Sequence, residues 1–200
     1  MRRNIWSVEE LAQWATIPVI NGLTDLLHPC QILSDLFTII EKKGSYRNVK
    51  IAYIGDGNNV ANTWIEAAAR LPIRLSLACP KGYEPDRTIM TKGRRETQEG
   101  IVLCNDPFEA AKNADVLYTD VWVSMGQEAE DKKRKKIFKD YQINSNILKA
   151  AKKDAIVMHC LPAHRGEEIS PDVIDGPHSV VIDQAENRLH VQKAVLELLL

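Results

Sequence analysis

Short apolar runs alternate with helix-like segments from Val49 onward, and this alternation constrains the fold more than any other feature of the sequence. Each run is long enough for a buried strand and too short for a buried helix. Strands are expected over residues 49–54, 73–78, 101–104, 115–121 and 155–158. Because helical segments separate them, these strands should run parallel, with helices on both faces of their sheet. The sequence therefore predicts an α/β fold with a doubly wound, mostly parallel, five-stranded sheet.

Helices are expected between these strands and at both ends of the chain. The segments between strands predict helices over residues 59–70, 86–99, 106–113 and 145–152. Residues 7–10 have a capping-box pattern that would open a helix through Ala15. Pro29 would start a second helix and Gly44 would end it. Residues 186–200 predict a last amphipathic helix, whose apolar face needs a partner.

Composition and charge exclude several classes of protein. The 200 residues carry a formal net charge of -1, which gives no general attraction to nucleic acid or to an anionic membrane. The basic run at residues 132–136 lacks interleaved aromatic residues, so a solvated helix face is favoured over a nucleic-acid patch. No apolar run approaches the ~18 residues of a membrane span, and residues 1–20 lack a signal-peptide segment. The 4 cysteines form no C-x-x-C pair and no zinc pattern, which predicts reduced thiols in a cytoplasmic protein.

Three polar clusters follow the ends of predicted strands. Residues 55–59 follow the first strand, residues 120–126 the fourth, and residues 159–162 the fifth. In open parallel sheets, ligands bind at the carboxyl ends of the strands. The three clusters are therefore expected to form one site.

The cluster at residues 55–59 is similar to a dinucleotide-binding turn, but two features of that turn are missing. Val60 occupies the position of the third glycine, and Cys79-Pro80-Lys81 ends the next strand without an acidic residue. A nicotinamide site is therefore disfavoured. An asparagine in this turn could bind an amino-acid ligand or simply cap the following helix, and the sequence leaves both open.

The other two clusters carry groups that suit an amino-acid ligand. Asp120 could bind an ammonium group, while Ser124 and the N–H groups of its loop could hold a carboxylate. A structural loop is the alternative. Cys160 is either a reactive thiol, whose pKa His164 and Arg165 would lower, or an inert buried one.

The segment His28-Pro29-Cys30-Gln31 opens the second predicted helix. Helix N-termini attract anions and carbonyl oxygens, so His28 and Gln31 could polarise a substrate carbonyl. A simple cap with a surface glutamine is the alternative for these two residues.

Taken together, six segments resemble the motifs of the ornithine carbamoyltransferase family, in the family's order. They lie at residues 19–25, 28–31, 55–59, 124–128, 159–162 and 185–188. Each motif alone is weak, but the ordered set runs essentially from end to end and is very specific. The Ser-Met-Gly loop and the His-Cys-Leu-Pro turn point to ornithine rather than aspartate as the acceptor.

The resemblance implies transfer of a carbamoyl group from carbamoyl phosphate to the side-chain amine of L-ornithine, giving L-citrulline and phosphate. Residues implied to bind carbamoyl phosphate are His28, Gln31, Cys160, Leu161 and Arg188. Residues implied to bind ornithine are Asn59, Asp120, Ser124 and Met125. Asp120 and Cys160 would flank the reacting amine, with Cys160 as its proton acceptor. No metal and no organic cofactor are implied.

The resemblance also implies a division of the chain. Residues 45–185 would be a Rossmann-like ornithine-binding domain, residues 1–44 a remnant of the carbamoyl phosphate domain with a bridging helix, and residues 186–200 a second bridging helix. Family members are longer by an amino-terminal domain, which carries a Ser-Thr-Arg-Thr phosphate-binding motif and most contacts of the family's homotrimer. That motif does not occur here. We therefore expect uncovered apolar helix faces, self-association, and little or no activity from this chain alone.

Two other functions stay open at this point. A chain that lacks the phosphate-binding motif could be a non-catalytic ornithine-binding fragment, left by truncation of a gene. A nicotinamide oxidoreductase would rest on Gly55 and Gly57 alone.

Overall fold

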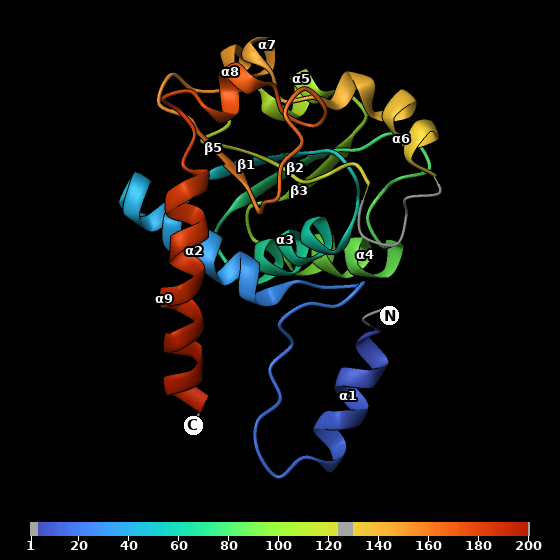
Figure 1. The fold of residues 1–200 in the computed structure, drawn as a ribbon, viewed down its shortest axis with the longest axis vertical. Coiled ribbons are helices and arrows are strands. Elements are labelled where there is room, and N and C mark those ends of the chain that lie inside the picture. Colours follow the sequence, from blue (N-terminus) through green and yellow to red (C-terminus); the bar gives the residue numbers. More distant parts are fainter. Residues whose placement is uncertain (1–3, 124–129, 200) are drawn as a thin grey trace.

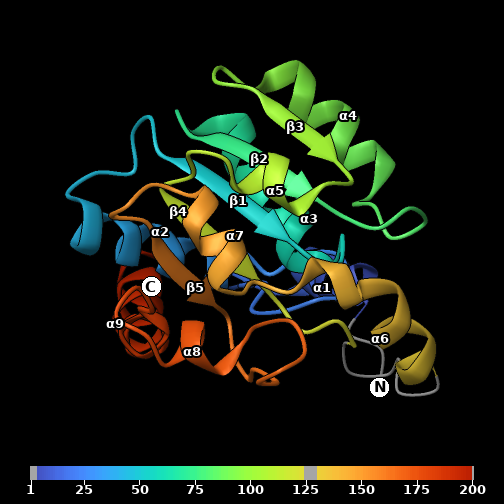
Figure 2. The ribbon, with the colours of Figure 1, turned by 90° about the horizontal axis from the view of Figure 1, so that it is seen from above.

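The structure, a computed structural model, describes residues 4–123 and 130–199. A sheet of five strands in the order β3-β2-β1-β4-β5 lies at its centre (Figures 1 and 2). The strands are β1 (Lys50–Ile54), β2 (Arg74–Ala78), β3 (Ile101–Cys104), β4 (Val116–Thr119) and β5 (Ile156–His159). All strand pairings in the described residues are parallel, which confirms the predicted α/β fold.

Helices cover both faces of the sheet (Figure 1). One face carries α2 (Pro29–Lys43), α3 (Asn59–Arg70) and α4 (Arg87–Glu96). The other carries α5 (Pro107–Ala111), α7 (Ser145–Ala150) and α8 (Pro171–Ile174). The remaining helices are α1 (Ile5–Trp14), α6 (Asp131–Phe138), the short 3-10 helix η2 (Lys139–Tyr141) and α9 (Val181–Leu199). Helix α9 packs along α2 next to β5 (Figure 2).

The alternation of side chains along the strands builds one apolar core on each face. Tyr53 of β1 and Tyr118 of β4 stack with ring centroids 5.9 Å apart, and Trp64 of α3 packs edge-on against Tyr118. Leu117 of β4 points the other way, into a cluster that includes the buried Phe138 of α6. Strands that are buried on both faces read as continuous apolar runs, which is why these strands could be found in the sequence.

The strand order reverses between β1 and β4. The chain moves from β1 through β2 to β3 on one side, then returns to place β4 on the other side of β1. Asp56 follows β1 and Asp120 follows β4, so a carboxylate ends each of the two strands that flank the reversal. Ligands of open α/β sheets bind at such a point, because the connections diverge there and leave a crevice.

Several element boundaries agree with the sequence analysis. Helix α3 and strand β3 have the predicted bounds. Helix α2 begins at Pro29 and ends before Gly44, whose φ of 78° is the left-handed conformation that favours glycine. Local chemistry sets the start of α3 at the Asn58 cap and both ends of α2, and such chemistry can be read from a sequence.

Other boundaries are corrections. Helix α1 begins at Ile5, because the Asn4 side chain accepts a hydrogen bond from the Trp6 amide, so the predicted cap Ser7 lies inside the helix. Strand β4 ends at Thr119 rather than at residue 121. Helix α9 begins at Val181 rather than at residue 186, and α8 was not predicted.

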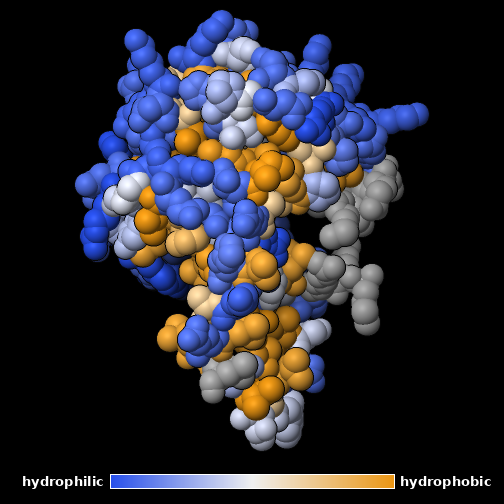
Figure 3. Space-filling model, turned by 60° about the vertical axis from the view of Figure 1, so that its left-hand side comes forward, coloured by the Kyte–Doolittle hydropathy of each residue, from blue (hydrophilic) through white to orange (hydrophobic). Residues whose placement is uncertain are grey.

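Apolar side chains of α1, α2 and α9 remain exposed. Helix α1 lies apart from the layers around the sheet, and its Trp6 and Trp14 are 71% and 82% exposed. Leu198 of α9 is 83% exposed. Figure 3 shows hydrophobic side chains gathered over the end of the molecule where α9 finishes. These uncovered faces agree with the expectation from the sequence.

A membrane-crossing helix would need both length and apolar character. None of the helices within residues 4–123 and 130–199 has both.

Candidate functional site

The carboxylate of Asp120 joins the ends of three strands. Its Oδ1 atom accepts a hydrogen bond from the Cys160 Sγ at 3.0 Å, and its Oδ2 atom accepts one from the Asn58 side chain at 2.6 Å. Asp120 follows β4, Cys160 follows β5, and Asn58 lies between β1 and α3. The three polar clusters expected to form one site therefore converge at this edge of the sheet, next to the reversal in strand order.

The two asparagines of the turn after β1 have different partners. Asn58 caps α3, where its Oδ1 accepts hydrogen bonds from the amides of Val60 and Ala61. Its Nδ2 then donates to Asp120. Asn59 donates from Nδ2 to the Thr24 carbonyl at 2.7 Å. Asn59 was predicted as a site residue and Asn58 was not, although a cap position directly before a helix was a usable signal.

The surroundings of Cys160 favour its neutral thiol form. Burial first, and then the charge of Asp120, raise the pKa of the Cys160 thiol well above its ordinary value. This direction is opposite to that of the reactive-thiol alternative, in which His164 and Arg165 would lower the pKa of Cys160. Arg165 instead pairs with Asp175 at 2.7 Å. His164 is exposed, and its ring faces Glu168.

His159 orders the turn that carries Cys160. Its Nδ1 accepts a hydrogen bond from the Leu161 amide at 2.9 Å, so Nε2 carries the ring proton and donates to Glu168 at 3.1 Å. Both side chains are fully buried. This pair holds Leu161, which has a φ of 55°, in a conformation that residues other than glycine rarely adopt. Glu168 was not singled out from the sequence, because nothing local links it to His159.

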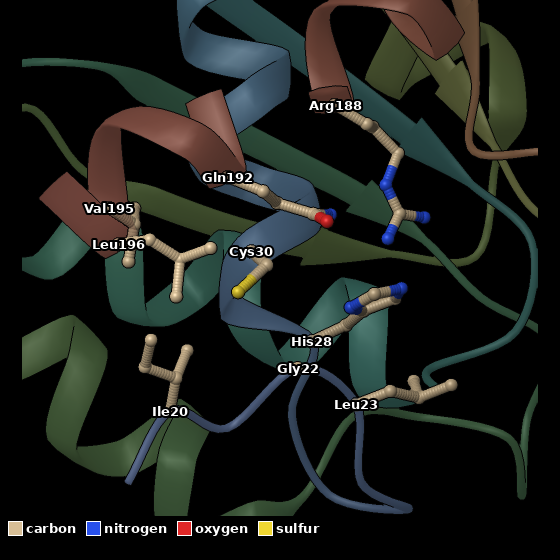
Figure 4. A pocket seen from close by; sticks show the side chains of 9 residues that line it. All are labelled: Ile20, Gly22, Leu23, His28, Cys30, Arg188, Gln192, Val195 and Leu196. Atoms are coloured by element: carbon tan, nitrogen blue, oxygen red, sulfur yellow. The ribbon is translucent and has the colours of Figure 1, made fainter. Parts of the chain in front are cut away.

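A second group of predicted residues surrounds a cavity of about 720 Å³ (Figure 4). His28 stands at the start of α2, and its amide donates to the Thr63 hydroxyl at 2.8 Å. Arg188 of α9 faces the same cavity and donates from Nη1 to the buried Gln31 side chain at 2.8 Å. In Figure 4 the Arg188 guanidinium and the His28 ring point into the same space.

The cavity is polar at one end and apolar at the other. Gln192 lies beside Arg188, while Ile20, Val195 and Leu196 line the apolar part. A guanidinium next to apolar walls suits an anion or a carbonyl oxygen. Asn59, Asp120 and Cys160 are not among the residues that line this cavity. The predicted site residues therefore form two groups, one at Asp120 and one at Arg188.

Ser124 and Met125, predicted to contact an amino acid, lie outside the described residues. On the carboxyl side of that gap, Arg134 of α6 is buried and forms an ion pair with Asp56. Arg134 also donates to the Trp122 carbonyl and lies over the Tyr83 ring, 4.7 Å from its centroid.

The basic run at residues 132–136 is thus not simply a solvated helix face, because Arg134 is 3% exposed. Arg134 and the buried Phe138 lie four positions apart, on one face of α6, which was a possible signal. Burial raises the pKa of Asp56 to about 6, although Arg134 acts to lower it.

Asp120, His159 and Cys160 bring possible metal-ligand atoms within 4.8 Å of one another. Both ring nitrogens of His159 already make hydrogen bonds, to Leu161 and Glu168. A metal ion at this position would have to replace one of them.

Two family descriptions match the chain. "Aspartate/ornithine carbamoyltransferase, Asp/Orn binding domain" matches residues 47–199. "Aspartate/ornithine carbamoyltransferase, carbamoyl-P binding domain" matches residues 1–41. The two matches follow one another along the sequence and together span nearly all of it.

Named relatives and solved structures agree with these matches. The ornithine carbamoyltransferase of Syntrophus aciditrophicus is 70% identical over 193 residues, which cover 96% of this chain and 64% of that protein. Ornithine carbamoyltransferase from Pyrococcus furiosus superimposes with a TM-score of 0.92 at 55% identity, over 96% of this chain and 63% of that one. The anabolic enzyme from Campylobacter jejuni gives 0.93 at 42% identity, over 100% and 67%.

This chain therefore spans 64% of the length of the Syntrophus relative and a similar share of the two solved chains. The matched residues cover 96% of this chain. The chain belongs to the aspartate/ornithine carbamoyltransferase family.

Proposed function

We propose that this chain takes part in carbamoyl transfer from carbamoyl phosphate to the side-chain amine of L-ornithine, which yields L-citrulline and phosphate. The observation that carries the proposal is the contact of 3.0 Å between the Cys160 thiol and the Asp120 carboxylate at the reversal of strand order. The names of the relatives support ornithine as the acceptor.

Asp120 and its surroundings form the proposed acceptor subsite. A buried carboxylate attracts the ammonium group of an amino acid more strongly than an exposed one, because water screens it less. Asn59, Ser124 and Met125 are proposed to hold the rest of ornithine. For Ser124 and Met125 this rests on the resemblance alone.

The Arg188 cavity forms the proposed carbamoyl phosphate subsite, with His28 and Arg188 on its lining and Gln31 behind them, bonded to Arg188. Arg188 offers donors to the carbamoyl oxygen or to phosphate. Leu161 already uses its amide to bond His159, so the turn at Cys160 and Leu161 would contribute its carbonyl oxygens, which suit the carbamoyl NH2 group.

The amine must lose a proton before it attacks, because an ammonium group has no lone pair. In the absence of substrate Cys160 is a thiol, which cannot accept a proton. A cation bound between Asp120 and Cys160 would favour the thiolate, so the thiol proton leaves to solvent when ornithine binds. The thiolate then accepts a proton from the ammonium group. The amine nitrogen bonds to the carbamoyl carbon as the bond to phosphate breaks, and the second proton of the amine passes to the departing phosphate.

The proposed division of the chain follows the resemblance, with residues 1–44, 45–185 and 186–200 as three parts. The family descriptions change near the same position, between residues 41 and 47. We also propose a cytoplasmic location, since the four cysteines are free thiols. Homotrimer formation is proposed for the complete enzyme only.

Calorimetry with two ligands tests the acceptor subsite. The chain is expected to bind L-ornithine more tightly than L-2-aminopentanoic acid, which lacks the side-chain amine. Asp120→Asn is expected to reduce the ratio of the two affinities at least about tenfold, because the ammonium group loses its charged partner. Asp140→Asn, at an exposed carboxylate in η2, is the matched control and should keep the preference.

A citrulline assay on the same samples tests how far this chain acts by itself. Ornithine binding with little or no citrulline is the result expected of this chain, whereas citrulline formation would exclude a non-catalytic ornithine-binding fragment. If citrulline forms, Cys160→Ser should slow it by about 10²–10⁴-fold, the usual contribution of a proton-transfer group. Equal binding of both ligands by the unaltered chain would contradict the acceptor subsite.

A further inference from the structure

Asp35 of α2 is a fully buried carboxylate that accepts three hydrogen bonds. Its Oδ1 accepts from Gln31 Nε2 at 2.9 Å and from Gln184 Nε2 at 2.8 Å. Its Oδ2 accepts from the Tyr118 hydroxyl at 2.8 Å. The three donors come from α2, α9 and β4, so Asp35 lies where two helices meet the sheet.

The amide oxygens of the two glutamine side chains face groups that can only donate hydrogen bonds. Gln31 Oε1 accepts from Arg188 Nη1 at 2.8 Å, and Gln184 Oε1 accepts from the His159 amide at 2.9 Å. Each amide must therefore turn its oxygen outwards and its NH2 group towards Asp35. If either amide turned over, two donors would face each other at its outer end. An acceptor at position 35 is what keeps both amides in the required orientation.

We propose that Asp35 is a positioning residue that holds both substrate subsites in register, through Gln31 to Arg188 and through Gln184 to the turn at His159 and Cys160. The assignment of Arg188 and of the turn at Cys160 to substrate subsites rests on the proposed function. The hydrogen bonds that connect them through Asp35 do not depend on it. One buried carboxylate thus orients a guanidinium in the Arg188 cavity and the strand end that carries the thiol.

The ionisation state of Asp35 should affect these hydrogen bonds. Burial raises the pKa of Asp35 to about 6, against the lowering effect of the bonds from Tyr118, Gln31 and Gln184 and of the charge on Arg188. Cys160 is a further titratable group whose pKa responds to the charge of Asp35. Below about pH 6 a proton converts one carboxylate oxygen into a donor, so both amides then depend on the one uncharged oxygen that remains an acceptor.

Nuclear magnetic resonance of the glutamine side chains tests the proposal without any substrate. The NH2 resonances of Gln31 and Gln184 should exchange slowly with water and shift together with a midpoint near pH 6. Asp35→Asn keeps one acceptor oxygen but should abolish that midpoint. Gln142, whose amide bonds the carbonyls of Gly166 and Glu167, is the internal control and should show no midpoint near 6.

Alkylation of Cys160 by iodoacetamide, followed by peptide mass spectrometry, reports on the turn that Asp35 reaches through Gln184. Asp35→Leu removes the acceptor and should raise the alkylation rate of Cys160 at least tenfold, whereas Asp35→Asn should leave it close to the original rate. Asn187→Leu is the matched control, because Asn187 makes another buried contact between α9 and α2, to Thr38 at 3.0 Å. It should change the rate much less.

Three results would overturn the proposal. They are the absence of a shared midpoint for the two glutamines in the unaltered chain, its persistence in Asp35→Asn, and an equal rise in Cys160 alkylation in Asn187→Leu and Asp35→Leu. If Asp35→Leu does not fold, the titrations of the unaltered chain and of Asp35→Asn still decide. A failure of ornithine binding would overturn the proposed function and leave these readouts intact.

Discussion

Arg134 is buried in a basic segment whose Lys132, Lys133 and Lys136 face solvent. Arg134→Met would leave Asp56 as a buried charge without its partner, and we expect a loss of about 3–5 kcal/mol in the free energy of unfolding at pH 8. The loss should be smaller at pH 5. Asp56 has a pKa of about 6, so at that pH it can take up a proton and no longer needs a cation. Urea denaturation at the two pH values measures both effects.

Lys133→Met is the control for this experiment, since it removes a positive charge from the same helix at an exposed position. It should change stability by no more than about 0.5 kcal/mol. Equal losses in the two variants would show that the ion pair between Arg134 and Asp56 contributes nothing specific.

Single residues were predictable from sequence when their position in the chain determined their role. Asp120 and Cys160 follow strands, and parallel strands end at one edge, so their proximity could be inferred before any coordinates. Asp35 and Gln184 are 149 positions apart, and no local pattern links them. The same holds for the hydrogen bond between Gln31 and Arg188. The family resemblance pointed to both residues, but only the fold reveals their contact.

At the scale of elements, several ends with a local chemical cause were found, such as the end of α2 at Gly44, although the Asn4 cap of α1 was missed. The start of α9, which lacks such a cause, was also missed. Val180, Val181 and Ile182 are β-branched and look like a strand, yet α9 begins at Val181 because the preceding residues bridge to β5 and the chain then turns along α2. Propensity was overridden there by packing.

The turn between β1 and α3 depends on a close approach of two backbones. A Cβ atom on Gly57 would lie 2.2 Å from the backbone nitrogen of Pro85, which cannot move as a side-chain end can. Gly57→Ala should therefore lower the free energy of unfolding by about 1–3 kcal/mol, the usual cost of overpacking. Thermal unfolding followed by circular dichroism would measure the change.

Gly22→Ala is the matched substitution for Gly57→Ala, because no atom lies within 4 Å of the added Cβ. It should leave the unfolding temperature nearly unchanged. If both variants unfold at the temperature of the original chain, the contact between the Gly57 turn and the segment at Pro85 is not tight.

For the whole molecule, the exposed apolar surface on α1 and α9 predicts self-association. The average mass in sedimentation velocity should rise above the 22.5 kDa of one chain as concentration increases. Trp14→Ser combined with Leu198→Lys should reduce this rise, because both side chains are more than 80% exposed. Val102→Ser removes an exposed apolar side chain from β3 and should have little effect. A constant mass near 22.5 kDa at all concentrations would contradict the prediction.

The class of the fold was predictable from sequence, whereas the strand order was not. Alternating strands and helices imply a parallel sheet, but they do not say which strand lies at its centre. That β1 lies between β2 and β4 follows from pairings such as Ile51 with Val116, which join distant parts of the chain.

The central place of β1 also has a consequence for biosynthesis. A nascent chain that grows from its amino terminus can pair β1 with β2 soon after both emerge, but the other side of β1 must wait for β4, about 65 residues later. At a ribosome speed of roughly 5–20 residues per second, that side stays open for on the order of ten seconds. During that interval an unpaired strand edge is available to neighbouring polypeptides, so chaperone demand should be greatest while the stretch from β2 to β4 is being translated.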